Sequence, residues 1–467
     1  MPFDLLITQG TAVTTDAVFR ANVAVNGGKI AALLSPQDMP AAGQVIDAAG
    51  CYVLPGAVDA HVHLHMLTAA GIYSADDWCT GTRAAALGGV TSVVDFIQAL
   101  PGQTLMEALH ERVDDARDAV IDYGFHTTIH PDEAPIGGVN KRVSDYRIGE
   151  IRQAADAGCP TFKMYQAYSG LQVQDADLFR ALRAIAEVNG LACVHAENGD
   201  VLQALRDAVT SPAELVNGLN HARTRPAIQE AEAVNRTIMC AELSGARVLI
   251  FHISCDLAGS VVADAKGRGL TNVFGETCPQ YLVFTDDKLA RPDARLWMCA
   301  PPLRPQADLD ALWRKLKTGV LDVVSSDHCP FTRAQKDLGA GDFRRVPNGM
   351  PGIETRLGLL YEYGVRAGKI SLNDWVRVCS TRPAELHGLR SKGRLAPGYD
   401  ADIVIFDPDS PRELSAAQLH SALDYSVCDG MTCAGWARDV LLRGRAIVQN
   451  GRHTGRAGDG QFLKRSF

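Results

Sequence analysis

Three histidines occupy alternate positions of the segment "AVDAHVHLHM" at residues 57–66: His61, His63 and His65. In a β-strand, residues i and i+2 share a face and lie about 6.6 Å apart, so two such imidazoles can lean toward one metal ion. A third imidazole at i+4 would lie about 13 Å from the first, which is too far for one ion to hold both. The segment alone is compatible with a metal site, a proton relay or a strand with polar inward positions.

Four more ionisable residues follow apolar runs elsewhere in the chain: Lys163 in "TFKMY", His195 in "CVHAE", His252 in "IFHIS" and Asp327 in "SSDHC". Each of them alone has an ordinary explanation, such as a hydrogen-bonded histidine, an ion-paired lysine or a helix cap. Together, at the ends of strand-like runs, they are hard to explain by packing. They therefore predict a catalytic centre that could hold metal ions.

The remaining histidines fit this pattern less well. His126 and His130 fall on another strand-like run, where His130 is a weak pocket candidate and a structural role is favoured. Surface or structural roles are expected for those that follow no strand end, namely His110, His221, His387, His420 and His453.

Eight apolar strand-like runs alternate with helical patterns in the middle of the chain. The runs are residues 56–63, 91–96, 124–130, 160–165, 191–197, 247–254, 271–276 and 320–328. Helical patterns between them include residues 76–89, 104–120, 175–190 and 236–245. This alternation predicts an α/β fold, a TIM-type (β/α)8 barrel over residues 55–388. Catalytic groups in such barrels lie at the carboxyl ends of the strands, where the ionisable residues above are found.

The two ends of the chain are rich in β-strand patterns. Residues 1–54 contain short apolar runs and the turn sequence Asn26-Gly27-Gly28, and residues 389–467 contain "DADIVIFDP" and "VLLRGRAIVQNGRHT". We therefore expect residues 1–54 and 389–467 to form a small β-sandwich domain with a C-terminal tail.

Composition excludes several classes of protein. The 467 residues are 46% hydrophobic with a formal net charge of −8, and basic runs are missing, which argues against nucleic-acid or anionic-membrane binding. The sequence has no apolar window long enough for a membrane span and no secretory pattern at its start. Its 12 cysteines form no C-x-x-C pair and are expected to be reduced core residues of a cytoplasmic protein.

The chain resembles the dihydropyrimidinases and hydantoinases, which are cyclic amidohydrolases of the amidohydrolase superfamily. The matching stretches are "LPGAVDAHVHL", "TFKMYQAY", "VHAENGD", "FHIS", "ETCPQYL", "APPLR", "SSDHCPF", "NGMPGIETR" and "GYDADIVIFDP". They extend from the fifties to about residue 408 and so cover most of the chain.

The resemblance implies a centre of two divalent metal ions, usually zinc. His61, His63 and Asp327 would bind one ion, and His195 with His252 the other. Lys163, carboxylated by CO2, would bridge both. An anionic carbamate makes physical sense there, because two nearby cations disfavour an ammonium group.

The implied reaction opens the ring of a 5,6-dihydropyrimidine or a 5-substituted hydantoin to an N-carbamoyl amino acid. A metal-bridging hydroxide would attack the ring carbonyl, Asp327 would carry the proton to the leaving nitrogen, and Tyr168 would stabilise the oxyanion. Ala300 and Asn348 would hold the amide edge of the ring through their backbones, with Ala300 standing where the family has serine.

Loop composition and the family also suggest specificity and assembly. Leu64, Met66, Leu67 and Ile72, in the loop of residues 64–73, predict tolerance of a hydrophobic 5-substituent. Tyr165 and Gln166 belong to a second such loop. A homotetramer, or a dimer, is expected, to which the tail of residues 407–467 could contribute.

Three relatives offer alternatives. Allantoinases share the metal ligands but typically lack the tyrosine that matches Tyr168, and they are the nearest enzymatic alternative. Dihydroorotases usually carry arginine where this chain has His65, which argues against them. Non-catalytic assembly proteins have lost metal ligands, whereas all six ligand positions are filled here, which makes a scaffold role improbable.

Overall fold

The computed structural model describes residues 2–68, 71–132 and 142–467. Its centre is an eight-stranded sheet of parallel strands in the order β13-β12-β11-β10-β9-β8-β7-β6. The strands are β6 (Ala57–Asp59), β7 (Val90–Ile97), β8 (Asp122–Thr128), β9 (Thr161–Tyr165), β10 (Leu191–His195), β11 (Arg247–Ile250), β12 (Val273–Thr277) and β13 (Val323–Val324). A parallel bridge between Val62 and His328 brings the first and last strands together. The predicted barrel is therefore confirmed, with each expected run supplying one strand.

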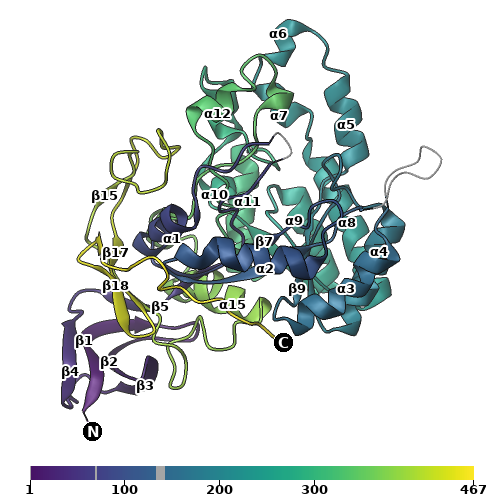
Figure 1. Cartoon of the computed structure of the whole chain (residues 1–467). Coiled ribbons are helices and arrows are strands. Elements are labelled where there is room, and N and C mark those ends of the chain that lie inside the picture. The colour runs from purple at the N-terminus through teal and green to yellow at the C-terminus, as the bar shows by residue number, and fades with distance from the viewer. Residues whose placement is uncertain (1, 69–70, 133–141) are drawn as a thin grey trace.

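Helices connect the strands and cover the barrel (Figure 1). They are α1 (Trp78–Leu87), α2 (Leu105–Asp115), α3 (Asp145–Asp156), α4 (Asp175–Glu187), α5 (Gly199–Asp207), α6 (Pro212–Leu215), α7 (Leu219–Arg223), α8 (Ala227–Ser244), α9 (Asp256–Gly267), α10 (Gln280–Val283), α11 (Gln306–Lys317), α12 (Arg333–Asp337), α13 (Arg356–Leu360), α14 (Leu372–Val376) and α15 (Arg382–Leu386). Local sequence sets their ends. Thr104 and Glu107 form a reciprocal capping box at the start of α2, and Gly245, with φ of 72°, ends α8.

Alternate residues of the strands fill the interior of the barrel. This inner core contains Phe96, Leu191, Cys193, Leu249, Phe251, Phe274, Val323 and Leu386. The period of two, seen in 191 and 193 and again in 249 and 251, follows from the alternation of side chains along a strand. The interior is thus largely packed with apolar and aromatic side chains.

Several strands end earlier than the sequence predicted. The run 56–63 is strand only to Asp59, and the run 320–328 is strand only at Val323–Val324. The chain beyond these strands is held by other contacts: the His63 amide donates to the His328 carbonyl at 2.8 Å. His61, His63 and Asp327 therefore lie on the segments just after their strands.

A second sheet of nine strands joins the two ends of the chain. Its order is β19-β18-β17-β14-β5-β1-β2-β3, with β4 paired to β1. The strands are β1 (Phe3–Val13), β2 (Val18–Asn26), β3 (Lys29–Leu34), β4 (Ala42–Asp47), β5 (Tyr52–Pro55), β14 (Ile403–Asp407), β17 (Trp436–Leu442), β18 (Arg445–Gln449) and β19 (Arg452–His453). β15 (Arg412–Glu413) and β16 (Thr432–Cys433) form a separate pair. The purple and yellow strands lie side by side in Figure 1, as the pairing of β5 with β14 requires.

The last residues of the chain leave this sheet and return to the barrel. The Leu463 amide donates to the Tyr123 carbonyl at 2.7 Å, and the Arg465 amide donates to the Gly158 carbonyl at 3.0 Å. Tyr123 lies at the start of β8 and Gly158 just before β9, so both acceptors are at the amino-terminal side of barrel strands. The C-terminus therefore packs against the base of the barrel. The division into a β-rich domain of residues 1–54 and 389–467 and a barrel domain of residues 55–388 stays a prediction.

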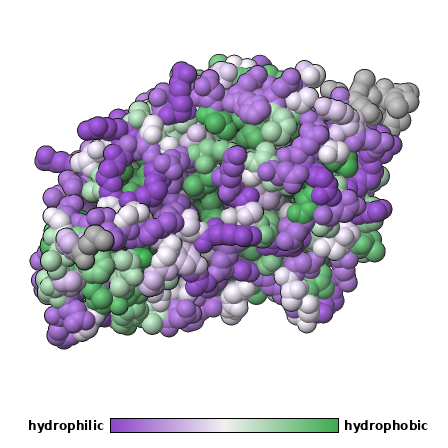
Figure 2. All heavy atoms as spheres, turned by 60° about the horizontal axis from the view of Figure 1, so that its bottom comes forward, coloured by the Kyte–Doolittle hydropathy of each residue, from purple (hydrophilic) through white to green (hydrophobic). Residues whose placement is uncertain are grey.

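Hydrophilic residues cover most of the face shown in Figure 2, with apolar residues in patches between them. Among the described helices, none is long and apolar enough to cross a membrane.

Candidate metal centre

His61, His63 and Asp327 converge at the carboxyl end of the barrel. The Nε2 atoms of His61 and His63 lie 3.2 and 3.3 Å from the same Asp327 oxygen, Oδ1. All three side chains are buried, and one ligand atom of each lies within 4.8 Å of the others. The aspartate reaches this position through a backbone φ of 50°, in the left-handed region that costs energy for a residue other than glycine.

The protonation of His61 indicates what this cluster can bind. Its Nδ1 lies 2.7 Å from Glu276 Oε1, an oxygen that also accepts the His252 amide at 3.2 Å. Because that oxygen is an acceptor, His61 Nδ1 carries the hydrogen and Nε2 is left as a lone pair. Burial lowers the pKa of His61 well below its usual value, so the ring is neutral. A lone pair then faces the Asp327 carboxylate, an arrangement that a cation between them makes favourable.

His195 and His252 form a second facing pair. His195 ends β10 and His252 follows β11, and His195 Nδ1 lies 2.8 Å from His252 Nε2. Burial lowers the pKa of both imidazoles, which are therefore neutral donors of the type that zinc and related ions accept. The His61 and His252 rings lie 5.4 Å apart between centroids, so the two groups adjoin. His252, like Asp327, has a positive φ, of 40°.

Lys163 is buried among aromatic rings beside these groups. Its Nζ lies 4.3 Å from the centroid of Phe251 and 4.6 Å from that of Tyr165. No carboxylate of the described residues lies within ion-pair distance of this amine, although Asp327 and Glu276 are near enough to favour its charge. Burial outweighs them and lowers the pKa of Lys163 to about 8. A neutral amine is the form that reacts with CO2, so the lysine fits the carboxylation that the resemblance implies.

Two buried glutamates hold His61 and His195 and were not singled out from the sequence. Glu276 bonds His61 Nδ1, and Glu197 Oε2 lies 2.9 Å from His195 Nε2, which leaves His195 Nδ1 free to face His252. Such outer partners fix the tautomer and orientation of a ligating histidine. Glu276 begins "ETCPQYL" and Glu197 lies in "VHAENGD", each directly after an apolar run. An acidic residue at the end of a strand was therefore the signal that could have identified them.

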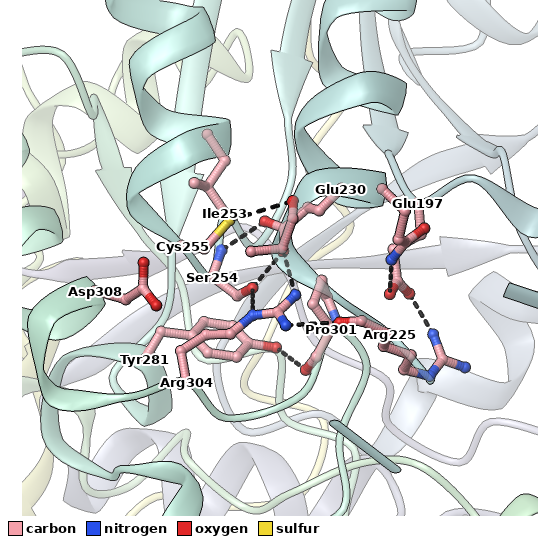
Figure 3. A network of polar contacts seen from close by, with 12 residues as sticks. Glu197, Arg225, Glu230, Ile253, Ser254, Cys255, Tyr281, Pro301, Arg304 and Asp308 are labelled. Carbon is pink, nitrogen blue, oxygen red and sulfur yellow. Dashed lines mark hydrogen bonds and ion pairs between the residues drawn. The ribbon is translucent and has the colours of Figure 1, made fainter. Parts of the chain in front are cut away.

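Glu197 is also part of a wider polar network (Figure 3). It pairs with Arg225 and accepts from Gln229 Nε2 at 3.0 Å. Burial raises the pKa of Glu197, but Arg225 and His195 outweigh burial and hold this pKa well below its usual range. The Arg225 guanidinium in turn lies 5.9 Å from the centroid of the Tyr168 ring.

Arg304 extends the same network. Its guanidinium donates to Ser254 Oγ at 2.9 Å, to Glu230 Oε2 at 2.8 Å and to the Arg225 carbonyl at 2.6 Å (Figure 3). Nearby, the Tyr281 hydroxyl donates to the Pro301 carbonyl at 2.7 Å. These contacts fix the segment that follows Ala300.

Ala300 and Asn348 lie on segments that a buried lysine ties together. Lys336 Nζ donates to the carbonyls of Met298, Pro347 and Gly349 at 3.0, 2.7 and 2.8 Å. The Gly349 amide also donates to the Met298 carbonyl at 3.0 Å. Asn348 Oδ1 is buried with no hydrogen-bond partner among the described residues.

Tyr168 lies close to the second histidine pair. Its ring centroid is 4.9 Å from that of His195 and 5.8 Å from that of Tyr165. A φ of 74° turns the backbone sharply at this residue. Burial raises the pKa of its hydroxyl, which therefore keeps its proton and can donate a hydrogen bond.

His65 lies apart from the cluster. Its Nδ1 lies 2.9 Å from Asp115 Oδ1, and its ring stacks on Tyr73 with centroids 4.5 Å apart. Four apolar residues were expected around a substituent pocket. For Leu64 this prediction is wrong, because its side chain is fully buried in the main core. Met66, Leu67 and Ile72 are partly or largely exposed, and residues 69–70 of this loop lie outside the described residues.

Replacing Glu276 with glutamine should weaken metal binding without unfolding the chain. Burial raises the pKa of Glu276, and bound cations would favour its charged form. The amide keeps the shape but cannot carry that charge, so metal affinity should fall roughly 10–100-fold. A competition titration with a chromogenic chelator measures this. Glu354→Gln is the matched control, because Glu354 Oε1 holds His420 Nδ1 at 2.8 Å in the same kind of pair. An affinity within twofold of the wild type for Glu276→Gln would contradict the role.

Comparison with known proteins gives the family. The model of the "Amidohydrolase family" matches residues 52–447. The chain is 40% identical to a D-hydantoinase of Geobacillus stearothermophilus, over 99% of this chain and 96% of that protein. It is 38% identical to a D-phenylhydantoinase of Escherichia coli, over 99% and 98%. The solved dihydropyrimidinase of Brevibacillus agri superposes with a TM-score of 0.92 at 41% identity, over 99% and 98%. The chain therefore belongs to the amidohydrolase family, among its dihydropyrimidinases and hydantoinases, as its sequence predicted.

Proposed function

We propose that this enzyme opens the ring of a 5,6-dihydropyrimidine or a 5-substituted hydantoin by hydrolysis, giving an N-carbamoyl amino acid. The observation that carries the proposal is the convergence of two sets of possible metal ligands, His61–His63–Asp327 and His195–His252, beside the buried amine of Lys163. Relatives named D-hydantoinase, D-phenylhydantoinase and dihydropyrimidinase support the choice of a cyclic amide.

Two divalent ions, zinc by the chemistry of the ligands, would be held by these residues, with carboxylated Lys163 between them. When bound, the ions would supply Lewis-acid activation of water and of the substrate carbonyl. The imidazole and carboxylate donors are those that zinc prefers, and the outer glutamates leave the histidine lone pairs facing inward.

The side chains around the ions have separate roles in this proposal. The Asp327 carboxylate receives a proton from the attacking water and delivers it to the leaving ring nitrogen. The Tyr168 hydroxyl donates to the carbonyl oxygen as negative charge develops there. Backbone groups of Ala300 and Asn348 hold the amide edge of the ring, and Lys336 keeps their two segments at a fixed separation.

A substrate panel tests the reaction class. The full chain, reconstituted with zinc and supplied with bicarbonate, should open dihydrouracil, hydantoin and hydantoins with alkyl or aryl groups at carbon 5. Turnover is followed by loss of ring absorbance and by mass spectrometry of the N-carbamoyl product. Dihydrouracil turnover without any 5-alkyl or 5-aryl hydantoin would contradict the apolar pocket, and selective turnover of allantoin would favour an allantoinase. Absence of turnover in a protein with two zinc ions would overturn the proposal.

The pH dependence of reconstitution tests the state of Lys163. Its amine must lose a proton before it attacks CO2, and the pKa is lowered to about 8. Below this pKa the neutral fraction grows tenfold per pH unit, and above it the fraction is constant. At fixed CO2 pressure, the initial rate of zinc uptake by metal-free protein should rise about tenfold from pH 7 to pH 9 and then level off. A rate that keeps rising beyond pH 10 would indicate an ordinary exposed lysine.

From the family resemblance, we also expect this chain to form a homotetramer or a dimer. Light scattering of the purified full chain checks it.

A further inference from the structure

A second group of metal-binding side chains lies inside the barrel: His126, Cys193 and His387. His126 comes from β8, Cys193 from β10 and His387 from the residue after α15. All three are fully buried, and one ligand atom of each lies within 4.8 Å of the others. Sequence patterns did not point to this group, because His387 follows no strand-like run and Cys193 resembles a core residue.

Hydrogen bonds to backbone carbonyls fix the tautomers of both histidines. His126 Nε2 donates to the Ala60 carbonyl at 2.8 Å, so Nδ1 is a lone pair, and it lies 3.8 Å from Cys193 Sγ. His387 Nδ1 donates to the Pro383 carbonyl at 2.8 Å. Its Nε2 is therefore a lone pair as well, and this buried atom has no partner among the described residues. A carbonyl acceptor behind a histidine is the usual outer partner of a metal ligand.

The spacing of the donors fits a small coordination sphere. With the bond lengths that zinc makes, about 2.3 Å to sulfur and 2.0–2.1 Å to nitrogen, an angle of 120° would place the two ligand atoms about 3.8 Å apart. The observed separation of His126 Nδ1 and Cys193 Sγ is 3.8 Å. Burial lowers the pKa of His126 well below its usual value and that of His387 to about 3, so both rings are neutral.

Aromatic rings separate this group from the metal centre above it. Phe96 stacks on His63 on one side, with centroids 4.6 Å apart, and on His126 on the other, 4.9 Å apart. Phe251 also lies between the two levels, 4.0 Å from His61 and 5.6 Å from His126. The inner group is therefore a distinct site.

The charge around the group indicates which ion it would accept. Arg465 is buried beside it and donates to the His387 carbonyl at 3.1 Å, to Thr161 Oγ1 at 3.0 Å and to the Phe125 carbonyl. Burial raises the pKa of the Cys193 thiol, so an ion would have to displace its proton. The resulting thiolate and two neutral imidazoles would carry one negative charge, which one monovalent cation would neutralise. A divalent ion would leave an extra buried positive charge next to the guanidinium. Thiolate and imidazole together select soft ions.

We propose that His126, Cys193 and His387 bind one copper(I) ion inside the barrel, with release of the thiol proton of Cys193. The ion would join β8, β10 and the end of α15 at the base of the barrel. It would stabilise the folded chain, because the three ligands come together only after folding.

The test loads the ion while the chain folds, since the site is closed afterwards. The full chain is made by cell-free synthesis without oxygen, with zinc and copper(I) supplied, and its metals are counted by mass spectrometry. The wild type should hold one copper besides its zinc, with one sulfur and two nitrogen neighbours in X-ray absorption, and should melt at a higher temperature than protein made without copper. Cys193→Ser and His387→Gln, made separately, should each lose the copper and keep the zinc content of the wild type.

Cys159→Ser is the matched control. Cys159 is a buried thiol near Arg465, and burial raises its pKa to about 11 although Arg465 lowers it. It is not one of the three clustered residues, so this variant should keep its copper. A wild type without copper, or copper content unchanged in both Cys193→Ser and His387→Gln, would overturn the site. Zinc in place of copper at the same three residues would overturn the charge argument and with it the assignment of copper(I). If either Cys193→Ser or His387→Gln fails to fold, the copper content of the other variant tests the site.

Discussion

Replacing Lys163 with alanine is expected to remove metal and activity together. In the proposed centre the lysine, once carboxylated, is the one ligand that both ions share, and alanine leaves two cations with no anion between them. Losing an outer partner of a metal ligand costs about 10–100-fold, so losing the bridge should cost more than 100-fold in metal affinity. Metal analysis after dialysis and ring opening of dihydrouracil should therefore both fall to background.

The matched control for Lys163→Ala is Lys336→Ala. Lys336 is equally buried, and burial lowers its pKa to about 7, but it binds three backbone carbonyls. Its replacement should leave two metal ions in place and raise KM, because the segments of Ala300 and Asn348 would be freed. If Lys163→Ala kept both ions and the full rate, the carbamate bridge would be wrong. If both variants lost metal equally, the effect would be a general one of removing a buried lysine.

The barrel could be predicted because each strand carries its own signal. Runs such as 191–197 and 247–254 are apolar over enough residues to be recognised, and the rule on strand ends then locates Lys163, His195 and His252 without any long-range information. The ends of the strands could not be predicted as well. At Asp327, for example, a φ of 50° turns the chain away from the strand, and nothing in "SSDHC" announces that turn.

Contacts between distant residues could not be predicted from patterns. Glu276 bonds a histidine 215 positions away, and only closure of the barrel brings the two together. The same holds for His387 and Cys193, which sequence patterns assigned to structural and core roles. Leu64 illustrates the opposite error: its apolar side chain, in a loop that shapes the pocket in the family, suggested a pocket residue, whereas it packs under α1 near Gly81. Local patterns therefore describe elements well and the partners of single side chains poorly.

Replacing Tyr168 with phenylalanine is expected to keep both metal ions and lower kcat. Burial keeps the hydroxyl protonated, and its ring lies 4.9 Å from His195, next to the atoms that would face the substrate carbonyl. A hydrogen bond that forms fully only as the oxyanion develops contributes about 2.7–4 kcal/mol, so kcat should fall about 10²–10³-fold with little change in KM. Steady-state kinetics on a 5-substituted hydantoin, with metal content measured on the same sample, gives both quantities.

Tyr165→Phe is the matched control for Tyr168→Phe. Its ring lies 5.8 Å from the same histidine, at the end of β9, and it faces the Lys163 amine with its ring face, 4.6 Å away, which phenylalanine preserves. We expect the Tyr165 variant to stay within about threefold of the wild type, since no bond to the reacting oxygen is removed. Equal losses in the two variants would mean that the aromatic environment of the centre, rather than the Tyr168 hydroxyl, sets the rate. A Tyr168→Phe enzyme within threefold of the wild type would assign the oxyanion to the metal alone.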